Sequence, residues 1–289
     1  MFGGALRVIP ALGLELADTS AGLTRVAGFG RPVEVEVDDD PAWLPRLGLI
    51  WRIVPGLRFK ANYLRAYRRP SFFELFHPDY GFLRGNPALQ PEDSVNFDAG
   101  LELARTSLGW LSDLRLEAVW FQRDIKDSIE WVLASRSSLP VNTGEARARG
   151  VELGGSFALL RRLRIAASYT FLDTEIRASG ASLPHSPRNQ LSVHADLRLG
   201  PTRLFADWTY EDELALVASP FADQVDAARQ LDVGISVRPA RLAGLHWMPE
   251  GLTVTSEWTN LLGEARVDSL GLPLPDETLW FVTLRGDFR

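Results

Sequence analysis

The sequence of 289 residues contains no cysteine, and none of its apolar runs reaches 18 residues. The first absence excludes a disulfide scaffold and a zinc site built on thiolates. The second excludes a transmembrane helix. Basic residues are in the minority, with 31 lysines and arginines against 37 acidic residues and a formal net charge of −6. This balance, with no basic cluster larger than two adjacent arginines, argues against nucleic acid as a partner.

Methionine is scarce and aromatic residues are abundant, with 2 Met against 9 Trp and 15 Phe. Such a load indicates either an aromatic core or the aromatic belts of a membrane protein. Mean hydropathy near zero is typical of soluble proteins, but a membrane barrel has the same average because its apolar and polar residues alternate. The first ten residues do not have the pattern of a signal peptide. An exported form is therefore expected to have a longer precursor.

Alternation with a period of two is the dominant pattern of the chain. Between residues 190 and 199 every second residue is apolar and the others are polar or charged. We count about twelve such segments and no convincing helix. One of them, 114–131, is expected to continue past a kink near 124–126. The predicted strands cover 6–16, 47–53, 57–63, 94–103, 114–131, 148–159, 163–171, 190–199, 204–210, 230–238, 252–258 and 280–288.

The connections between these segments alternate between long and short, and the tightest lie at 55–56, 161–162 and 200–201. A sandwich has no reason to sort its loops this way, whereas an outer-membrane barrel has short periplasmic turns and long outer loops. Twelve strands would place both chain ends on the periplasmic side. The polar face needs water, which a barrel lumen or the solvated face of an ordinary sheet supplies. The predicted fold class is all-β, an antiparallel transmembrane β-barrel.

Trp280 and Phe288 lie on one face of the last predicted strand. Their spacing corresponds to roughly 19 Å along the membrane normal, at about 3.3 Å per residue and about 45° of tilt. That distance is close to the height of an apolar band with an aromatic belt at each margin. The alternative is an ordinary pair of cross-strand aromatic residues.

The loop between the third and fourth predicted strands is unusually long for a compact soluble domain. It contains Arg-Pro-Ser-Phe-Phe-Glu-Leu at 69–75 and Gly-Asn-Pro-Ala-Leu-Gln-Pro-Glu at 85–92. These motifs resemble the mid-barrel signature of TonB-dependent outer-membrane receptors. Further stretches resemble the same family and follow its order along the chain. They lie at 120–129, 141–152 (Val-Asn-Thr-Gly-Glu-Ala-Arg-Ala-Arg-Gly-Val-Glu), 183–189, 258–262 and 271–275.

The resemblance implies a barrel of 22 strands around an N-terminal plug. Residues 1–289 would be the C-terminal part of that barrel domain, with about 12 strands and no plug domain. The TonB complex would act only through the missing N-terminal region. The barrel-assembly machinery would read the last strand, which ends on Phe288 and is followed by Arg289. The surroundings would be outer-membrane lipid.

The implied function is uptake of a scarce ligand, such as a ferric siderophore or cobalamin, across the bacterial outer membrane. The sequence does not choose between iron chelates, cobalamin, nickel and oligosaccharides. One alternative is a self-contained barrel of 12 strands acting as a passive pore or adhesin. A second is a soluble β-rich binding module.

Ligand-binding candidates lie in the long loop. Three arginines there are candidates to contact an anionic ligand such as a metal chelate, and the alternative is solvation or pairing with Glu74 and Asp79. Aromatic residues of the loop would form a platform for the ligand or pack on the barrel rim; they are Phe72, Phe73, Phe76, Tyr80 and Phe82. The binding candidates are Arg68, Arg69, Phe73, Tyr80 and Arg84.

Catalytic and metal chemistry find little support. The four histidines are scattered and form no pair with the spacing of metal ligands, so we expect no metal and no cofactor. Ser192 and His194 share the polar face of one predicted strand, but no residue is marked as the third member of a triad. We interpret both as lining a lumen. The protein is not expected to be an enzyme.

Overall fold

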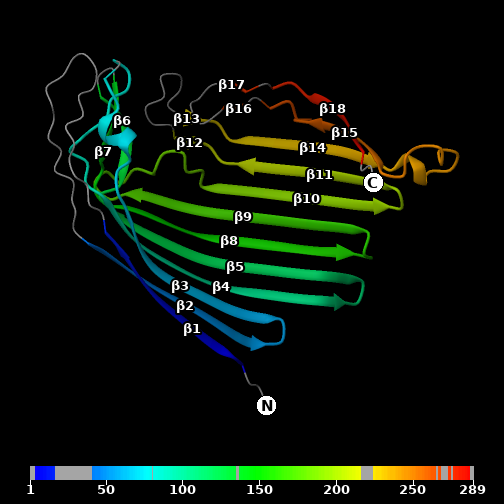
Figure 1. Cartoon of the computed structure of the whole chain (residues 1–289), viewed down its shortest axis with the longest axis horizontal. Helices are drawn as coiled ribbons and strands as arrows, with labels where there is room; N and C mark the ends of the chain where they lie inside the picture. Colours follow the sequence, from blue (N-terminus) through cyan, green and yellow to red (C-terminus); the bar gives the residue numbers. More distant parts are fainter. Residues whose placement is uncertain are drawn as a thin grey trace.

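Twelve antiparallel strands form one sheet, as the alternation predicts (Figure 1). The computed structural model describes residues 4–16, 41–79, 81–134, 137–215, 224–264, 266–267, 273–274 and 276–286. The strands of this sheet follow each other in chain order. They are β1 (Leu6–Glu15), β2 (Ala42–Val54), β3 (Leu57–Arg68), β4 (Glu92–Leu108), β5 (Leu111–Lys126), β8 (Ala146–Leu159), β9 (Leu163–Ile176), β10 (Asn189–Leu199), β11 (Thr202–Glu211), β14 (Ala228–Val237), β15 (Leu252–Thr259) and β18 (Leu279–Gly286).

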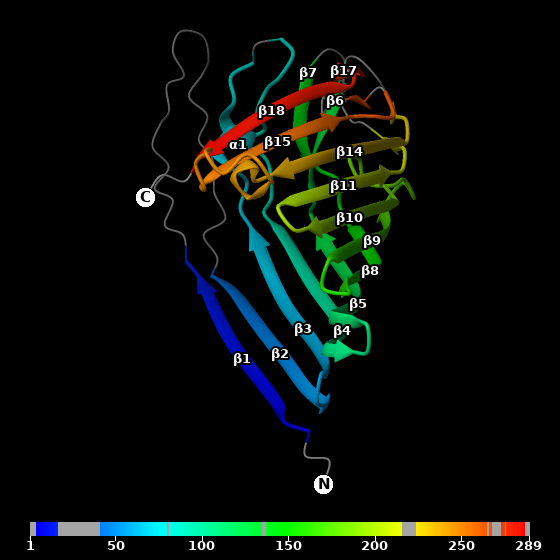
Figure 2. The same ribbon diagram turned by 90° about the vertical axis from the view of Figure 1, so that its right-hand side faces the viewer.

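The sheet is strongly curved and open (Figure 2). β1 and β18 are its two edges, and within the described residues they are not paired with each other. Each inner strand is hydrogen-bonded on both sides, so the backbone polar groups of the sheet interior are satisfied without water. No helix among the described residues is long and apolar enough to span a membrane.

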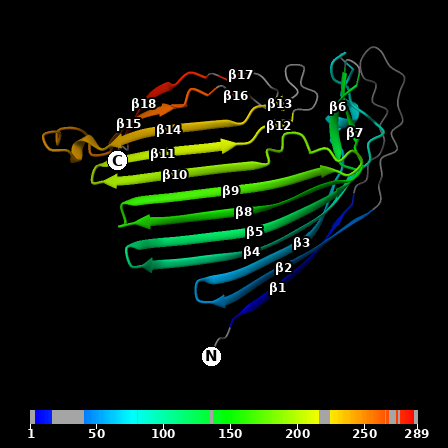
Figure 3. The same ribbon diagram turned by 180° about the vertical axis from the view of Figure 1, so that it is seen from behind.

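The connections sort by length between the two ends of the strands (Figure 3). One end, called here the short-turn end, has tight turns between β2 and β3, β4 and β5, β8 and β9, and β10 and β11. Gly56 and Gly200 occupy two of these turns with φ of 83° and 63°, values that glycine adopts without steric cost. The connection between β14 and β15 is the exception, because residues 238–251 contain the short 3-10 helix η1 (Pro239–Arg241).

The opposite end, called here the long-loop end, carries the remaining secondary structure. A five-residue helix, α1 (Phe72–Phe76), lies between β3 and β4. Three small hairpins lie in the other long connections; they are β6 (Ile129–Ala134) with β7 (Ser137–Asn142), β12 (Leu214–Ala215) with β13 (Gln224–Val225), and β16 (Arg266–Val267) with β17 (Pro273–Leu274).

The two faces of the sheet differ in polarity because residues that are paired across strands project to the same side. One face exposes large apolar side chains, including Trp51, Leu101 and Trp120, each more than 40% exposed. The other face carries charged residues such as Glu102, which contacts both Arg58 and Lys60. A sheet with these faces requires lipid on one side and water on the other.

Two predictions about the secondary structure are wrong. The segment 114–131 is not one strand, because β5 ends at Lys126, Asp127 takes a positive φ of 54°, and β6 pairs with β7 in a separate sheet. The expectation of no helix also fails at α1. The proposed spacing of Trp280 and Phe288 involves a residue outside the described part of the chain, although Trp280 does stack on Trp258, with ring centroids 6.5 Å apart.

Candidate ligand-binding site

The long loop between β3 and β4 is built on a capped helix. The backbone N–H of Glu74 donates to Ser71 Oγ at 3.2 Å, and the N–H of Ser71 donates to Glu74 Oε2 at 2.7 Å. This reciprocal pair is a capping box, which satisfies two N–H groups that a helix leaves without an internal partner. The spacing Ser-x-x-Glu is the signal in the sequence that marks α1.

The loop is tied to the β6–β7 hairpin by two asparagine side chains. Asn86 Nδ2 donates to the carbonyl of Pro140 at 2.9 Å. Asn142 Oδ1 accepts from the N–H of Gln90 at 2.8 Å, and its Nδ2 donates to the carbonyls of Gln90 and Asp127 at 2.9 and 2.7 Å. The motifs at 85–92 and 141–152 are therefore bonded to each other. One structural effect of these motifs is to fix the loop against the β6–β7 hairpin.

A small apolar core lies beneath this junction. Leu75, Leu89 and Ile129 are buried together, and Phe76 packs against them. Gly85 lies directly over the end of α1, where a Cβ atom would be 2.7 Å from the carbonyl oxygen of Leu75. No larger residue fits that position without displacing backbone. We call the unit formed by the loop 69–91 and the β6–β7 hairpin the loop platform.

Arg68, the last residue of β3, is held in place directly before the loop platform begins. Its guanidinium donates to Glu92 at 2.7 and 2.9 Å and to Glu74 at 3.1 Å. The sequence left open whether Arg68 contacts a ligand, is solvated, or pairs with Glu74 and Asp79. In the structure it pairs with Glu74 and with Glu92. Burial alone would raise the pKa of Glu74, but hydrogen bonds from Ser71 and the guanidinium of Arg68 outweigh it and lower that pKa.

The other candidates divide into covered and exposed residues. The Arg69 side chain is 17% exposed, lies 3.5 Å from Glu15, and stacks over the Tyr67 ring with its Cζ 5.5 Å from the centroid. Arg84 is exposed, and its backbone N–H donates to the carbonyl of Ser138 at 3.0 Å. Tyr80 lies outside the described residues.

Phe73 is the centre of an aromatic group on the loop platform. It is 53% exposed, and its ring centroid lies 4.5 Å from that of His77 and 5.7 Å from that of Trp131. Two more phenylalanines of the loop are still more exposed, Phe72 at 79% and Phe82 at 68%. We define Phe72, Phe73, Phe82 and Trp131 as the aromatic surface. Sequence reasoning missed Trp131 because it placed that residue in a barrel strand.

The polar face brings an unexpected partner to His194. Its Nδ1 lies 2.6 Å from Asp207 Oδ1, and the two residues are opposite each other in β10 and β11. A pair across strands cannot be read from sequence spacing, which explains why Asp207 was not found. Within the described residues no hydrogen bond joins Ser192 to His194. The same part of the chain contains no group of three or more His, Asp or Glu side chains suited to a metal ion.

A curved antiparallel sheet with an exposed apolar face, short turns at one end and long loops at the other defines an outer-membrane β-barrel protein. The chain belongs to the TonB dependent receptor-like, beta-barrel family, whose model matches residues 3–261. It is an outer-membrane protein, as the members of this family are. The family consists of receptors and transporters.

Two curated relatives match parts of the chain. The vitamin B12 transporter BtuB of Photobacterium profundum is 30% identical over 135 residues, which cover 45% of this chain and 20% of that protein. The heme/hemopexin utilization protein C of Haemophilus influenzae is 26% identical over 222 residues, covering 69% of this chain and 30% of that protein. The chain thus spans less than a third of the length of either relative.

Solved structures share the fold at low identity. The copper transporter OprC superposes with a TM-score of 0.72 at 18% identity, covering 96% of this chain and 45% of that one. The ferric enterobactin receptor PfeA of Pseudomonas aeruginosa superposes with a TM-score of 0.63 at 20% identity, covering 84% and 40%.

Proposed function

We propose that this chain is the C-terminal part of the barrel of an outer-membrane receptor that takes up a scarce small ligand. Family membership and the coverage of 40–45% of the solved receptors support this assignment. Energy would come through the TonB system, acting on a region of the receptor upstream of these residues. The barrel-assembly machinery would act on the last strand.

The observation that carries the binding part of the proposal is the loop platform. Hydrogen bonds and a buried core hold it at the long-loop end, where it presents the aromatic surface and Arg84 to the exterior. Exposed rings and an exposed arginine in the same loop suit a ligand with aromatic groups and negative charge, such as a ferric chelate. Arg68 and Arg69 would support the platform, since their guanidinium groups already lie against Glu92 and Glu15.

The self-contained barrel is the weaker candidate. It would require β1 and β18 to pair with each other, whereas within the described residues they are the two edges of an open sheet, and such edges in hydrocarbon cost several kcal/mol per unpaired backbone group. Partner strands from the rest of a larger barrel would remove both edges.

Measuring the size of the protein in outer membranes of its source tests the assignment. An antibody against residues 263–289 should detect a band well above the 32.1 kDa of this chain, and the band should shift when boiled in detergent. A heat-shifting band at the mass of this chain would overturn the assignment and support the small barrel.

Ligand binding is tested with the complete receptor and a panel of ferric catecholate, ferric hydroxamate, haem and cobalamin. We expect one chelate to bind, and F73A to weaken it by about tenfold, the loss expected for one aromatic stacking contact. W247A is the matched control, because Trp247 is 75% exposed but lies in the β14–β15 connection at the other end of the strands. Equal weakening by both variants would refute a ligand site on the aromatic surface.

A further inference from the structure

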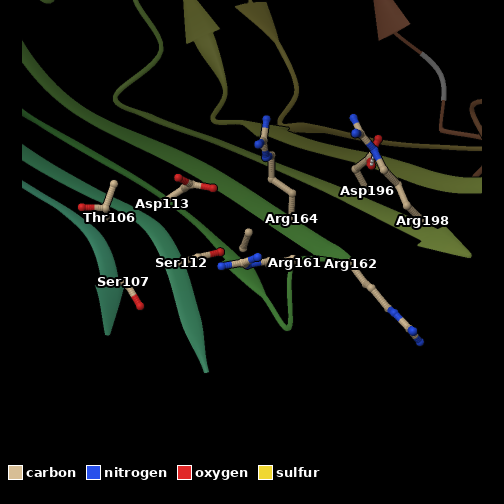
Figure 4. A pocket seen from close by; sticks show the side chains of 10 residues that line it. Thr106, Ser107, Ser112, Asp113, Arg161, Arg162, Arg164, Asp196 and Arg198 are labelled. Atoms are coloured by element: carbon tan, nitrogen blue, oxygen red, sulfur yellow. Dashed lines mark hydrogen bonds and ion pairs between the residues drawn. The ribbon is translucent and has the colours of Figure 1, made fainter. Parts of the chain in front are cut away.

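A second candidate site lies on the polar face at the short-turn end, away from the loop platform (Figure 4). A cavity of about 450 Å³ opens there between the β4–β5 turn, the β8–β9 turn and strand β10. Its lining includes Ser112, Arg161, Arg162, Arg164, Asp196 and Arg198. Four arginines around one small cavity are notable in a chain whose net charge is −6.

The two acidic residues of this cavity leave half of that positive charge uncompensated. Asp196 is almost fully buried and is already engaged by Arg198 at 3.1 Å and by Arg203. Asp113 also lines the cavity, but within the described residues it forms no ion pair with any of the arginines. The side chains of Arg161 and Arg164 have no hydrogen bond or ion pair in the same part of the chain.

A buried hydroxyl group lies among the residues that line the cavity. Ser112 Oγ is inaccessible to solvent and has no hydrogen-bond partner among the described residues. A buried donor left in this state is costly. In Figure 4 the Arg161 side chain points toward Ser112, and the Arg162 side chain runs in a different direction.

We propose that this cavity binds an oxyanion with two or more negative charges, of the phosphate or phosphoryl class. The guanidinium groups of Arg161 and Arg164 would donate to its oxygens, since the guanidinium fork matches the geometry of phosphate. Arg198 and Asp196, which are paired with each other, would form one side of the cavity. The site goes beyond the proposed uptake function and does not depend on it.

Calorimetric titration with inorganic pyrophosphate tests the site. The protein is purified in detergent, in the length found in outer membranes of its source, and titrated at low ionic strength; variants are compared only when their far-UV circular dichroism matches the parent. We expect saturable binding that R161Q and R164Q each weaken by at least about tenfold, the loss of one charge-assisted contact. R149Q is the matched control and should change affinity by less than about twofold, because Arg149 lies in β8 outside the cavity lining and pairs with Asp173 at 2.9 Å.

The outcomes separate the proposal from general charge attraction. Absence of saturable binding in the folded parent protein, or equal weakening by R149Q, overturns it. If R164Q does not fold, R164K replaces it, and weakening by R164K supports the fork geometry because lysine keeps the charge. Vesicles containing phosphatidylglycerol distinguish a lipid headgroup from a free anion. Vesicle binding that is unaffected by R161Q and R164Q, without pyrophosphate binding, also overturns the proposal.

Discussion

At the scale of single residues, the loop platform depends on a few side chains that bond to backbone. Ser71 caps α1, and Glu74 returns a bond to the same residue. We expect S71A to destabilise the platform by about 1 kcal/mol, the usual cost of losing an N-cap. Hydrogen exchange of the α1 amides measures this loss. S71T keeps the hydroxyl and should stay within a few tenths of the parent; equal effects of both variants would contradict a capping role.

Glu74 also gives the platform a pH dependence with a definite sign. Its pKa is lowered from 4.5 in the folded state, so its contribution to stability is complete above pH 4.5. The contribution is lost as the pH falls through the lower, folded value. We therefore expect protection of the α1 amides to decrease in that acid range. E74Q should remove the dependence, and an unchanged acid profile in E74Q would assign the effect to another group.

At the scale of elements, one asparagine joins the hairpin to the loop. Asn142 makes three hydrogen bonds to the backbone of Gln90 and Asp127. We expect N142A to destabilise the loop platform by about 1 kcal/mol, because the hydrogen bonds that tie the loop to the hairpin are lost, although the backbone groups they serve are exposed. Limited proteolysis between β6 and β7 reports the change. N142D retains the acceptor alone and should fall between parent and N142A.

The close approach of the loop to α1 predicts a second, steric effect. A Cβ at Gly85 would lie 2.6 Å from the His77 nitrogen, whereas a Cβ at Gly154 would meet its nearest atom at 3.9 Å. We expect G85A to lower the protease resistance of the loop and G154A to leave it unchanged. Similar behaviour of the two variants would contradict the packing described for the loop platform.

The sequence predicts the strands of the sheet but not the contacts of the binding candidates. Alternation with a period of two predicts the strands of the sheet because each strand has one apolar and one polar face. The binding candidates could not be sorted in the same way. Whether Arg68 faces a ligand or a carboxylate depends on Glu92, which lies 24 positions away and is brought near by strand pairing. The ring contact of Phe73 with Trp131 depends on a hairpin that the alternation does not reveal.

At the scale of the whole molecule, the open sheet predicts how the chain behaves by itself. Within the part of the chain that the structure describes, β1 and β18 each have one unpaired edge, and such edges in lipid associate with other strands. We expect the chain in lipid bilayers to form oligomers without the heat shift of a closed barrel. Co-expression with the upstream strands of the receptor should yield a single heat-shifting species. A monomeric heat-shifting band from the chain alone would contradict this expectation.

The hydrogen bonds that join the loop to the β6–β7 hairpin also set an order of folding. The contacts of Asn86 with Pro140 and of Gln90 with Asn142 join residues 54 and 52 positions apart. Contacts of such separation form only after the intervening chain has been placed, since closing a long loop costs entropy before any bond repays it. The loop platform therefore forms after β4 and β5 have paired. During folding, the time at which the loop platform becomes resistant to protease would show when the neighbouring strands of the sheet have formed.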